Sequence, residues 1–305
     1  MKYAILVIGA CGQLGTELTR ALRKKHGWKS VIAADIHPAM DAEGLYVQLD
    51  VFNKKKLAYI IAHRGVKQLY HLAAVLSALG EQNPAKAWDV NMQGLLNVLE
   101  VAKENKVWQV FWPSSIAVFD KNGELNPSTV YGISKAAGEY WCRYYFEKHG
   151  LDVRSLRYPG LISHRAKPGG GTTDYAVEIF HEAVNKGSYD CFLNRKSTLP
   201  MMYMPDAVRA ALELMDAPAA SISVRTAYNL AAMSFSPQEL ATEIKRHLPD
   251  FEMACNPDFS QAIANNWPVS VSDYRARRDW GWQEEYDIAR MTEDMLVNLG
   301  QKELC

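Results

Sequence analysis

The first half of the chain alternates between two kinds of hydrophobic pattern. Short, continuously apolar runs occur at 3–10, 30–36, 46–51, 68–74, 109–115 and 152–162. Between them, apolar positions recur at helical spacing over 13–26, 54–64, 84–104 and 131–149. Continuous rather than alternating apolar runs are typical of strands that helices cover on both faces. The pattern therefore predicts an α/β fold with a doubly wound, parallel sheet.

The pattern changes after residue 162. A polar, glycine-rich loop at 163–174 comes first, a helical pattern at 174–186 follows it, and Pro205 lies in the first turn of a further expected helix. Two unequal parts are therefore expected. They are a larger domain over 1–162, to which segments near 199–231 return, and a smaller lobe formed mainly by 163–305.

Composition removes several classes of function. The 305 residues include 34 basic and 34 acidic side chains, so the formal net charge is zero. A balanced chain lacks the positive surface that nucleic acids and anionic membranes attract, and we expect no partner of either kind. The longest apolar stretches have the length of strands, which predicts no membrane span.

Cysteine usage and the first residues bear on the compartment. The five cysteines are odd in number, far apart and without a C-x-x-C pair, which predicts neither a disulfide framework nor a zinc site. We therefore expect no metal. The first stretch, "MKYAILVIGACG", runs directly into an apolar strand, so we expect no cleaved leader. A reducing, cytoplasmic location is the simplest expectation.

A glycine-rich turn follows the first predicted strand. In "GACGQLG", Gly9, Gly12 and Gly15 are regularly spaced and lead directly into a helix. Glycines at such a turn let the backbone approach a pyrophosphate at the amino terminus of the helix. Asp35 ends the second strand, where its carboxylate can accept hydrogen bonds from both ribose hydroxyls of an adenosine. Because this charge repels a 2′-phosphate, the sequence predicts NAD rather than NADP. Asp50, which ends the string "YVQLD" within the third run, is either an adenine contact or a helix cap.

A serine, a tyrosine and a lysine are spaced for catalysis. Ser115 falls at the carboxyl end of the fifth predicted strand, the edge at which open α/β sheets bind ligands. Tyr131 and Lys135 are one helical turn apart and face the same direction. A neighbouring ammonium favours the phenolate, so Tyr131 can act as a base, while Ser115 holds the substrate oxygen. The three residues predict an oxidoreductase.

These strings resemble the extended short-chain dehydrogenase/reductase family, also called the NAD-dependent epimerase/dehydratase family. The resemblance rests on "GACGQLG", "HLAA", "NMQGLLNVLE", "SSIAVF", "YGISKAAGE" and "RYPGLI". It implies a Rossmann fold, bound NAD and catalysis by Ser115, Tyr131 and Lys135. The expected cofactor contacts are Gly9, Gly12, Gln13, Leu14, Gly15, Asp35, Ile36, Asp50, Val51, Leu72, Ala73, Ala74, Asn91, Tyr131, Lys135, Tyr158 and Pro159.

The second half is similar to one branch of that family, the short-chain threonine dehydrogenases. The matching strings are "PGGGTTDYAVEIF" at 168–180, "LPMMYMPDAVRA" at 199–210, "PDFSQAIANNWP" at 257–268 and "ARRDWGW" at 276–282. The resemblance implies oxidation of the β-hydroxyl of L-threonine to 2-amino-3-oxobutanoate with NAD as hydride acceptor. The expected substrate contacts are Ser77, Ser115, Tyr131, Thr172, Thr173, Asp174 and Trp280.

Four of these contacts have simpler alternatives. The glycine-rich segment that holds Thr172, Thr173 and Asp174 could be a flexible loop that ends in a helix cap. Trp280 is either a lid over the pocket or an ordinary packing residue. Which of the two threonines points inward is left open by the sequence.

Two other functions compete with this interpretation. A nucleotide-sugar epimerase or reductase would need side chains that grip a diphosphate, and the nearby candidates are Arg154, Arg157, Arg165 and Arg195. An NAD-binding scaffold without activity would tolerate the loss of the serine, tyrosine or lysine, all of which are present. Extra aromatic residues along 84–104 and 131–149 predict a homodimer that buries helix pairs in a four-helix interface.

Overall fold

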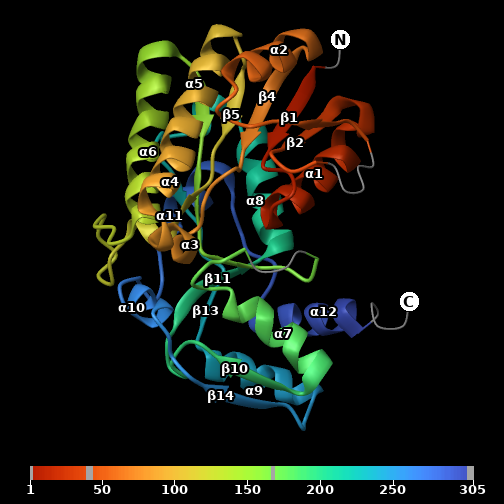
Figure 1. Cartoon of the computed structure of the whole chain (residues 1–305), viewed down its shortest axis with the longest axis vertical. Coiled ribbons are helices and arrows are strands. Elements are labelled where there is room, and N and C mark those ends of the chain that lie inside the picture. Colours follow the sequence, from red (N-terminus) through yellow and green to blue (C-terminus); the bar gives the residue numbers. More distant parts are fainter. Residues whose placement is uncertain (1–2, 39–43, 166–168, 301–305) are drawn as a thin grey trace.

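A six-stranded parallel sheet forms the upper part of the molecule (Figure 1). The computed structural model describes residues 3–38, 44–165 and 169–300. The sheet order is β3-β2-β1-β4-β5-β7, so the chain changes direction across the sheet between β1 and β4. This confirms the doubly wound fold that the sequence predicts. The strands are β1 (Ala4–Ile8), β2 (Val31–Asp35), β3 (Tyr46–Gln48), β4 (Val66–His71), β5 (Gln109–Phe111) and β7 (Asp152–Arg154).

Helices cover both faces of this sheet because successive β1 side chains point to opposite sides. Ile5 and Val7 pack with α1 (Gln13–His26) and α8 (Met204–Asp216), whereas Leu6 and Ile8 pack with the helices of the other face. That second set is α2 (Lys54–Arg64), α5 (Gly94–Glu104) and α6 (Val130–His149). Between α2 and α5 lie α3 (Ser77–Gln82), α4 (Pro84–Trp88) and a π-helical turn, Asp89–Gln93.

Local caps explain where two of these helices begin and end. The Asn53 side chain accepts a hydrogen bond from the Lys56 backbone N–H at the start of α2, and Gly65 ends that helix in the left-handed region. Thr129 caps the start of α6 in the same way, and Gly150 ends it. Caps of this kind depend on residues close in sequence, which is why the pattern predicts these helices well.

The predicted strand at 152–162 is wrong as a single element. It forms three short strands, β7, β8 (Leu156–Tyr158) and β9 (Gly160–Ile162), and each belongs to a different sheet. Pro159 separates the last two, because proline has no backbone N–H to donate to a ladder. Strand β8 lies between β6 (Ser114–Ser115) and β12 (Tyr228–Asn229) in one three-stranded sheet. Strand β9 pairs with β11 (Leu199–Tyr203), which also pairs with β13 (Met233–Phe235), in another.

The smaller lobe lies below the sheet (Figure 1) and has its own apolar core. Its elements are α7 (Tyr175–Lys186), β10 (Ser188–Cys191), α9 (Pro237–His247), β14 (Glu252–Cys255), α10 (Ser260–Ala264) and α12 (Ile288–Gly300). By contrast, α8, β12 and α11 (Tyr274–Trp280) return to the sheet or its flanking strands. We therefore propose the division expected from the sequence, with 1–162 and segments near 199–231 in one domain and 163–305 mainly in the other.

Candidate active site

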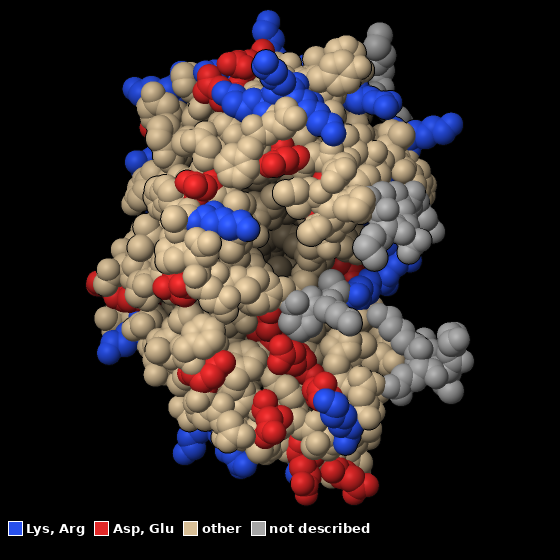
Figure 2. Space-filling view, in the orientation of Figure 1, with Lys and Arg blue, Asp and Glu red and all other residues tan. Residues whose placement is uncertain are grey.

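A hollow lies near the middle of the face shown in Figure 2, between the sheet and the smaller lobe. Uncharged residues surround most of it, and acidic side chains gather on the lobe below. The strands run downward in Figure 1, so their carboxyl ends face this region. Open α/β sheets bind ligands at that edge, where the strand order reverses. The candidate site is therefore built from the segments that follow β1, β2, β3 and β4, together with Ser115 at the end of β6 and the first turns of α6.

The three glycines after β1 differ in what surrounds them. Gly9 has φ of +82°, and a Cβ there would lie 2.6 Å from the Ala73 backbone nitrogen. A Cβ on Gly15 would lie 2.0 Å from the Gly9 carbonyl oxygen. Gly12 is different, because its Cβ would meet only the Gly9 oxygen, at 3.5 Å. Gly12 also directly precedes α1, where no side chain caps the helix. The open space fits a pyrophosphate held by backbone N–H groups.

Asp35, at the end of β2, stabilises the glycine-rich turn after β1. Its carboxylate accepts hydrogen bonds from the backbone N–H of Cys11 at 2.9 Å and of His37 at 3.2 Å. A carboxylate has about four acceptor positions, so it can still receive two ribose hydroxyls. Ile36, the next residue, is exposed. The arrangement fits the adenosine of NAD.

The residues after β3 and β4 complete the expected cradle. The Asp50 side chain is exposed and accepts a hydrogen bond from the Phe52 N–H at 2.9 Å. Since Asn53 is the cap of α2, the helix-cap alternative for Asp50 is wrong. Val51 is buried beneath this turn. Leu72, Ala73 and Ala74 remain partly exposed beside Gly9, and the cofactor roles of all these residues stay predictions.

Asn91 links the segment after β4 to the helix turn that carries Tyr131. From the π-helical turn, its amide oxygen accepts from the Val75 N–H at 2.8 Å, and its nitrogen donates to the Val75 carbonyl at 3.1 Å and to the Ser134 hydroxyl at 3.2 Å. Ser134 in turn donates to the Tyr131 carbonyl at 2.7 Å. Both amide N–H groups are therefore used within the protein. The role that this geometry supports is to hold the segment after β4 against the first turn of α6.

Tyr158 and Pro159 turn their side chains into the protein. The Tyr158 hydroxyl donates to the Ala207 carbonyl at 2.8 Å within the core, and Pro159 is buried between β8 and β9. Only the backbone of this segment is left to face a cofactor. The sequence resemblance placed these two residues at the site without indicating that their side chains serve the core.

The structure brings Ser115, Tyr131 and Lys135 together. Burial raises the pKa of Tyr131 to about 12, and its hydrogen bond with the Ser115 hydroxyl opposes that rise. The Lys135 ammonium donates to the Pro113 carbonyl at 2.6 Å and lies 5.5 Å from the centre of the Tyr131 ring. Burial lowers the pKa of Lys135 to about 7. A positive charge beside a buried phenol favours its phenolate, so the three residues can carry out proton abstraction.

Two glycines let α6 approach this cluster, and the motif search on the sequence missed both. A Cβ on Gly132 would lie 2.1 Å from the Ala117 carbonyl oxygen, and one on Gly138 would lie 2.3 Å from the Trp112 ring. Trp112 in turn stacks under the Lys135 ammonium, 4.4 Å from its ring centre. Glycine inside a helix is costly, so its presence in "YGISKAAGE" was a usable signal of close packing.

The predicted substrate contacts separate into two groups. The Ser77 and Thr172 hydroxyls are hydrogen-bonded at 3.2 Å, although they are far apart in sequence, and both residues are buried. Thr173 instead packs against Gly160, where a Cβ would lie 2.7 Å from its side chain. The structure thus pairs Thr172, not Thr173, with Ser77. The quoted string begins at Pro168, which lies outside the described residues.

Asp174 and Trp280 have structural partners. The Asp174 carboxylate accepts from the backbone N–H of Gly170 at 2.8 Å and of Gly171 at 2.7 Å, and its side chain does not cap α7. Asp174 therefore occupies the N-cap position of α7, while its side chain holds the glycine-rich loop in shape instead of capping the helix. Burial raises the pKa of Asp174. Trp280 packs against Tyr228 and Trp282, with ring centres 6.1 and 5.8 Å away, which supports the packing alternative over a lid.

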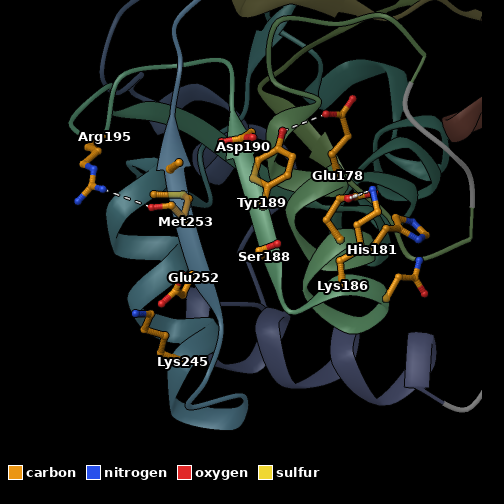
Figure 3. A pocket seen from close by; sticks show the side chains of 13 residues that line it. Glu178, His181, Lys186, Ser188, Tyr189, Asp190, Arg195, Lys245, Glu252 and Met253 are labelled. Atoms are coloured by element: carbon orange, nitrogen blue, oxygen red, sulfur yellow. Dashed lines mark hydrogen bonds and ion pairs between the residues drawn. The ribbon is translucent and has the colours of Figure 1, made fainter.

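A second cavity, of about 1160 Å³, lies in the smaller lobe between α7, β10, β14 and α9 (Figure 3). None of the residues predicted to contact NAD or threonine lines it, although Arg195, a candidate of the nucleotide-sugar alternative, does. Several of its charged side chains already have partners, since the Tyr189 hydroxyl donates to Glu178 at 2.9 Å and Lys186 pairs with Glu182 at 2.6 Å. The hollow at the sheet edge is therefore the better candidate for the active site.

Within residues 3–38, 44–165 and 169–300, no group of three histidine, cysteine or acidic side chains is placed to hold a metal ion. No helix in these ranges is both long and apolar enough to cross a membrane. Cys11, Cys142, Cys191 and Cys255 are free thiols.

Known proteins share this architecture over nearly its full length. A model of the NAD dependent epimerase/dehydratase family matches residues 5–231. The Bos taurus protein described as mitochondrial L-threonine 3-dehydrogenase is 44% identical over 97% of this chain and 82% of its own length. The holo structure of a GalE-like L-threonine dehydrogenase from Cupriavidus necator matches with a TM-score of 0.95 at 50% identity, covering 97% of this chain and 99% of its own. The apo structure of a monomeric L-threonine 3-dehydrogenase from a metagenome matches with a TM-score of 0.95 at 49% identity, covering 98% and 99%. Since the family match spans most of the chain and these relatives match almost all of it, the chain belongs to the NAD-dependent epimerase/dehydratase family.

Proposed function

We propose that this chain is an NAD-dependent L-threonine 3-dehydrogenase, which oxidises the threonine β-hydroxyl to give 2-amino-3-oxobutanoate, the first step in breaking threonine down to glycine. The observation that carries the proposal is the cluster of Ser115, Tyr131 and Lys135 at the edge that also holds the Gly12 cradle and Asp35. The relatives named above bear this activity in their descriptions and match nearly the whole chain.

Each residue of the cluster has a distinct part in the reaction. Tyr131 takes the proton of the β-hydroxyl, and Ser115 donates a hydrogen bond to the same oxygen as it becomes a carbonyl. The Lys135 ammonium stabilises the phenolate that this requires. The hydride that leaves the β-carbon is accepted by the nicotinamide, which is the chemistry that the cofactor supplies.

The cofactor is NAD rather than NADP. Asp35 is buried at the end of β2 and already accepts two backbone hydrogen bonds. Its negative charge suits the two hydroxyls of an unsubstituted ribose and opposes a 2′-phosphate in the same place.

The substrate is a small zwitterion. The buried pair of Ser77 and Thr172 offers hydroxyls, and Asp174 shapes the loop that carries Thr172. We propose Ser77, Ser115, Tyr131 and Thr172 as direct contacts. Thr173 and Asp174 then support the loop, and Trp280 packs against the core that includes α1 and α8.

The nucleotide-sugar alternative loses two of its basic candidates. Arg154 donates to Asp152 and to the carbonyls of Leu214 and Ala217 at the end of α8. Arg157 is used in a buried ion pair with Glu139. Neither guanidinium is available to grip a diphosphate, so a small amino acid suits the chain better.

We further propose a homodimer in the cytoplasm. Trp88 on α4 and Tyr140, Trp141 and Tyr144 on α6 are large apolar side chains exposed on neighbouring helices along the left edge of Figure 1. Burying them against a second copy would remove this surface from water. The free thiols fit a reducing compartment.

The test is formation of NADH with a panel of substrates. We expect turnover with L-threonine and NAD, and much slower turnover with D-threonine, L-allo-threonine, L-serine or NADP. Tyr131→Phe should bind NAD normally and lose at least a hundredfold in kcat, since positioned general bases contribute about 10²–10⁴-fold. NAD binding without turnover of any amino acid would contradict the proposal and return attention to nucleotide-sugars.

A further inference from the structure

A buried ion pair lies one helical turn beyond the lysine of the active site. Arg157 on β8 donates two hydrogen bonds to the Glu139 carboxylate on α6, at 2.7 Å through Nε and 2.6 Å through Nη2. Only 2% of the Glu139 side chain and 11% of the Arg157 side chain are exposed. Such two-point pairing is the strongest arrangement available to a carboxylate and an arginine.

The pair is held from two further directions. The Ser114 hydroxyl, next to the catalytic serine, donates to Glu139 Oε1 at 2.6 Å. Arg157 Nη1 donates to the Asn229 side chain on β12 at 3.0 Å, and the guanidinium lies 4.9 Å from the centre of the Phe119 ring. Glu139 therefore has little freedom to move away from its place on α6.

Glu139, Lys135 and Tyr131 share one face of α6, because each is four residues from the next. Burial pushes Lys135 toward its neutral form by lowering its pKa, and the Cys142 and Glu139 side chains on the same helix oppose that effect. Tyr131 depends on a charged Lys135 to become a phenolate. The ion pair is thus connected to the base through the lysine.

The other titratable groups near Lys135 are neutral around pH 7. Burial, with the lysine charge, holds the pKa of His71 on β4 at about 3, and neither ring nitrogen has a hydrogen-bond partner among the described residues. Burial also raises the pKa of Cys142 on α6 far above neutrality. Tyr131 itself is a neutral phenol until it gives up its proton. Glu139 is left as the anion acting on Lys135, with the Arg157 charge behind it on β8.

We propose that Glu139, fixed by Arg157 and Ser114, is a positioning residue that keeps Lys135 positively charged and so allows Tyr131 to act as the base at lower pH. This rests on the proposed function, in which Tyr131 removes the proton from the substrate hydroxyl. This role also explains why position 139 holds a buried carboxylate. An apolar residue there would leave the positive charges of Lys135 and Arg157 without a neighbouring negative charge.

The pH dependence of kcat/KM for L-threonine separates this role from a merely structural one. In Glu139→Gln, the ascending limb of the kcat/KM profile should move to higher pH by about one unit. At pH values below the limb, kcat/KM should fall about tenfold, and above the limb it should recover. Glu147→Gln is the matched control, since Glu147 is an exposed carboxylate on the same helix that pairs with Arg143. It should leave the limb in place. A uniform loss at every pH in Glu139→Gln would overturn the proposal.

Two further variants keep the test decisive if Glu139→Gln does not fold. Ser114→Ala removes one donor from the carboxylate and should shift the limb in the same direction by less. Arg157→Lys keeps the charge and should shift it less than Glu139→Gln does. A limb that stays in place in Ser114→Ala and moves only in Arg157→Lys would contradict the role of Glu139.

A second readout needs no substrate and so separates this inference from the proposed function. Phenolate formation by Tyr131 in the presence of NAD can be followed as the near-ultraviolet difference between the wild-type protein and Tyr131→Phe. Adding Glu139→Gln should move this titration to higher pH. If the wild-type protein failed to oxidise threonine, a shifted titration would still support the role of Glu139, and an unchanged one would overturn it.

Discussion

Gly9, Gly12 and Gly15 belong to one motif but answer different demands. Gly9 needs a positive φ and must pass close to the Ala73 backbone, and Gly15 must let α1 approach the Gly9 carbonyl. Gly12 has an ordinary φ of −73°, and a Cβ added there would have no protein atom closer than 3.5 Å beyond its chain neighbours. The two outer glycines therefore serve the fold, and the middle one leaves room for a ligand.

Gly12→Ala tests this difference. We expect the free energy of unfolding of the ligand-free protein to change by less than about 1 kcal/mol, because the added methyl meets no backbone closely. The Kd for NAD should rise by about tenfold or more, a cost of about 1.4 kcal/mol, because the methyl takes up space at the phosphate cradle. Urea unfolding and calorimetric titration measure the two effects.

The matched control is Gly15→Ala, whose methyl would overlap the Gly9 carbonyl oxygen. We expect Gly15→Ala to lower the free energy of unfolding of the protein even without NAD. If Gly12→Ala instead unfolded most of the protein and left the NAD affinity of the folded fraction unchanged, Gly12 would not lie at the pyrophosphate site.

At the scale of elements, α6 carries most of the proposed chemistry. Tyr131, Lys135 and Glu139 line one face, and Gly132 and Gly138 let the helix approach Ala117 and Trp112, which lie on either side of Ser115 in the sequence. The helix is capped at both ends by Thr129 and Gly150. A small displacement of α6 would therefore change every distance in the cluster at once.

Gly138→Ala should reverse the usual effect of this substitution. Alanine in place of glycine normally stabilises a helix interior by about 0.5–1 kcal/mol. Here the new methyl would lie 2.3 Å from the Trp112 ring, so we expect a loss of about 1–3 kcal/mol in urea unfolding and a lower kcat.

Gly94→Ala on α5 is the comparison, because its methyl would be 3.1 Å from a Val51 side-chain atom that can shift. It should cost less stability and leave kcat nearly unchanged. A Gly138→Ala protein that is more stable than the wild type would show that α6 and Trp112 are not in close contact.

The sequence was a good guide where the signals are local. The helices α1 and α2 begin and end where the pattern placed them, because caps and glycines lie within a few residues of the helix ends. The run at 152–162 misled, because three short strands join three sheets whose partners lie elsewhere in the chain. In the same way, the spacing of Tyr131 and Lys135 was visible in the sequence. The ion pair between Glu139 and Arg157 was not, because it depends on how β8 packs against α6.

At the scale of the whole molecule, the sheet edge and the smaller lobe enclose the hollow of Figure 2 from two sides. The bond between Ser77, which follows β4, and Thr172, which precedes α7, crosses from one part to the other. In the proposed function, substrate recognition thus depends on both parts, whereas the proposed cofactor contacts of Gly12 and Asp35 come from the sheet side alone. The exposed outer face of α4 and α6 lies away from the substrate contacts and the cofactor contacts, and it is open for association.

Association through this face can be tested with one charge. Trp141 is 39% exposed on α6, and Trp108, 59% exposed, lies just before β5 outside that face. If the chain is a homodimer through α4 and α6, Trp141→Glu should sediment as a monomer and Trp108→Glu as a dimer. A wild-type protein that is only monomeric at micromolar concentration, as the metagenome relative is described, would refute the dimer without affecting the site.

The proposed hydride transfer can be followed with L-threonine that carries deuterium on its β-carbon. The protein and NAD are supplied with this substrate, and the NADH formed is analysed by mass spectrometry. We expect one deuterium in the reduced nicotinamide for each turnover, because the hydride comes from the carbon whose hydroxyl Tyr131 deprotonates. NADH without the label, or no NADH at all from a protein that binds NAD, would contradict it.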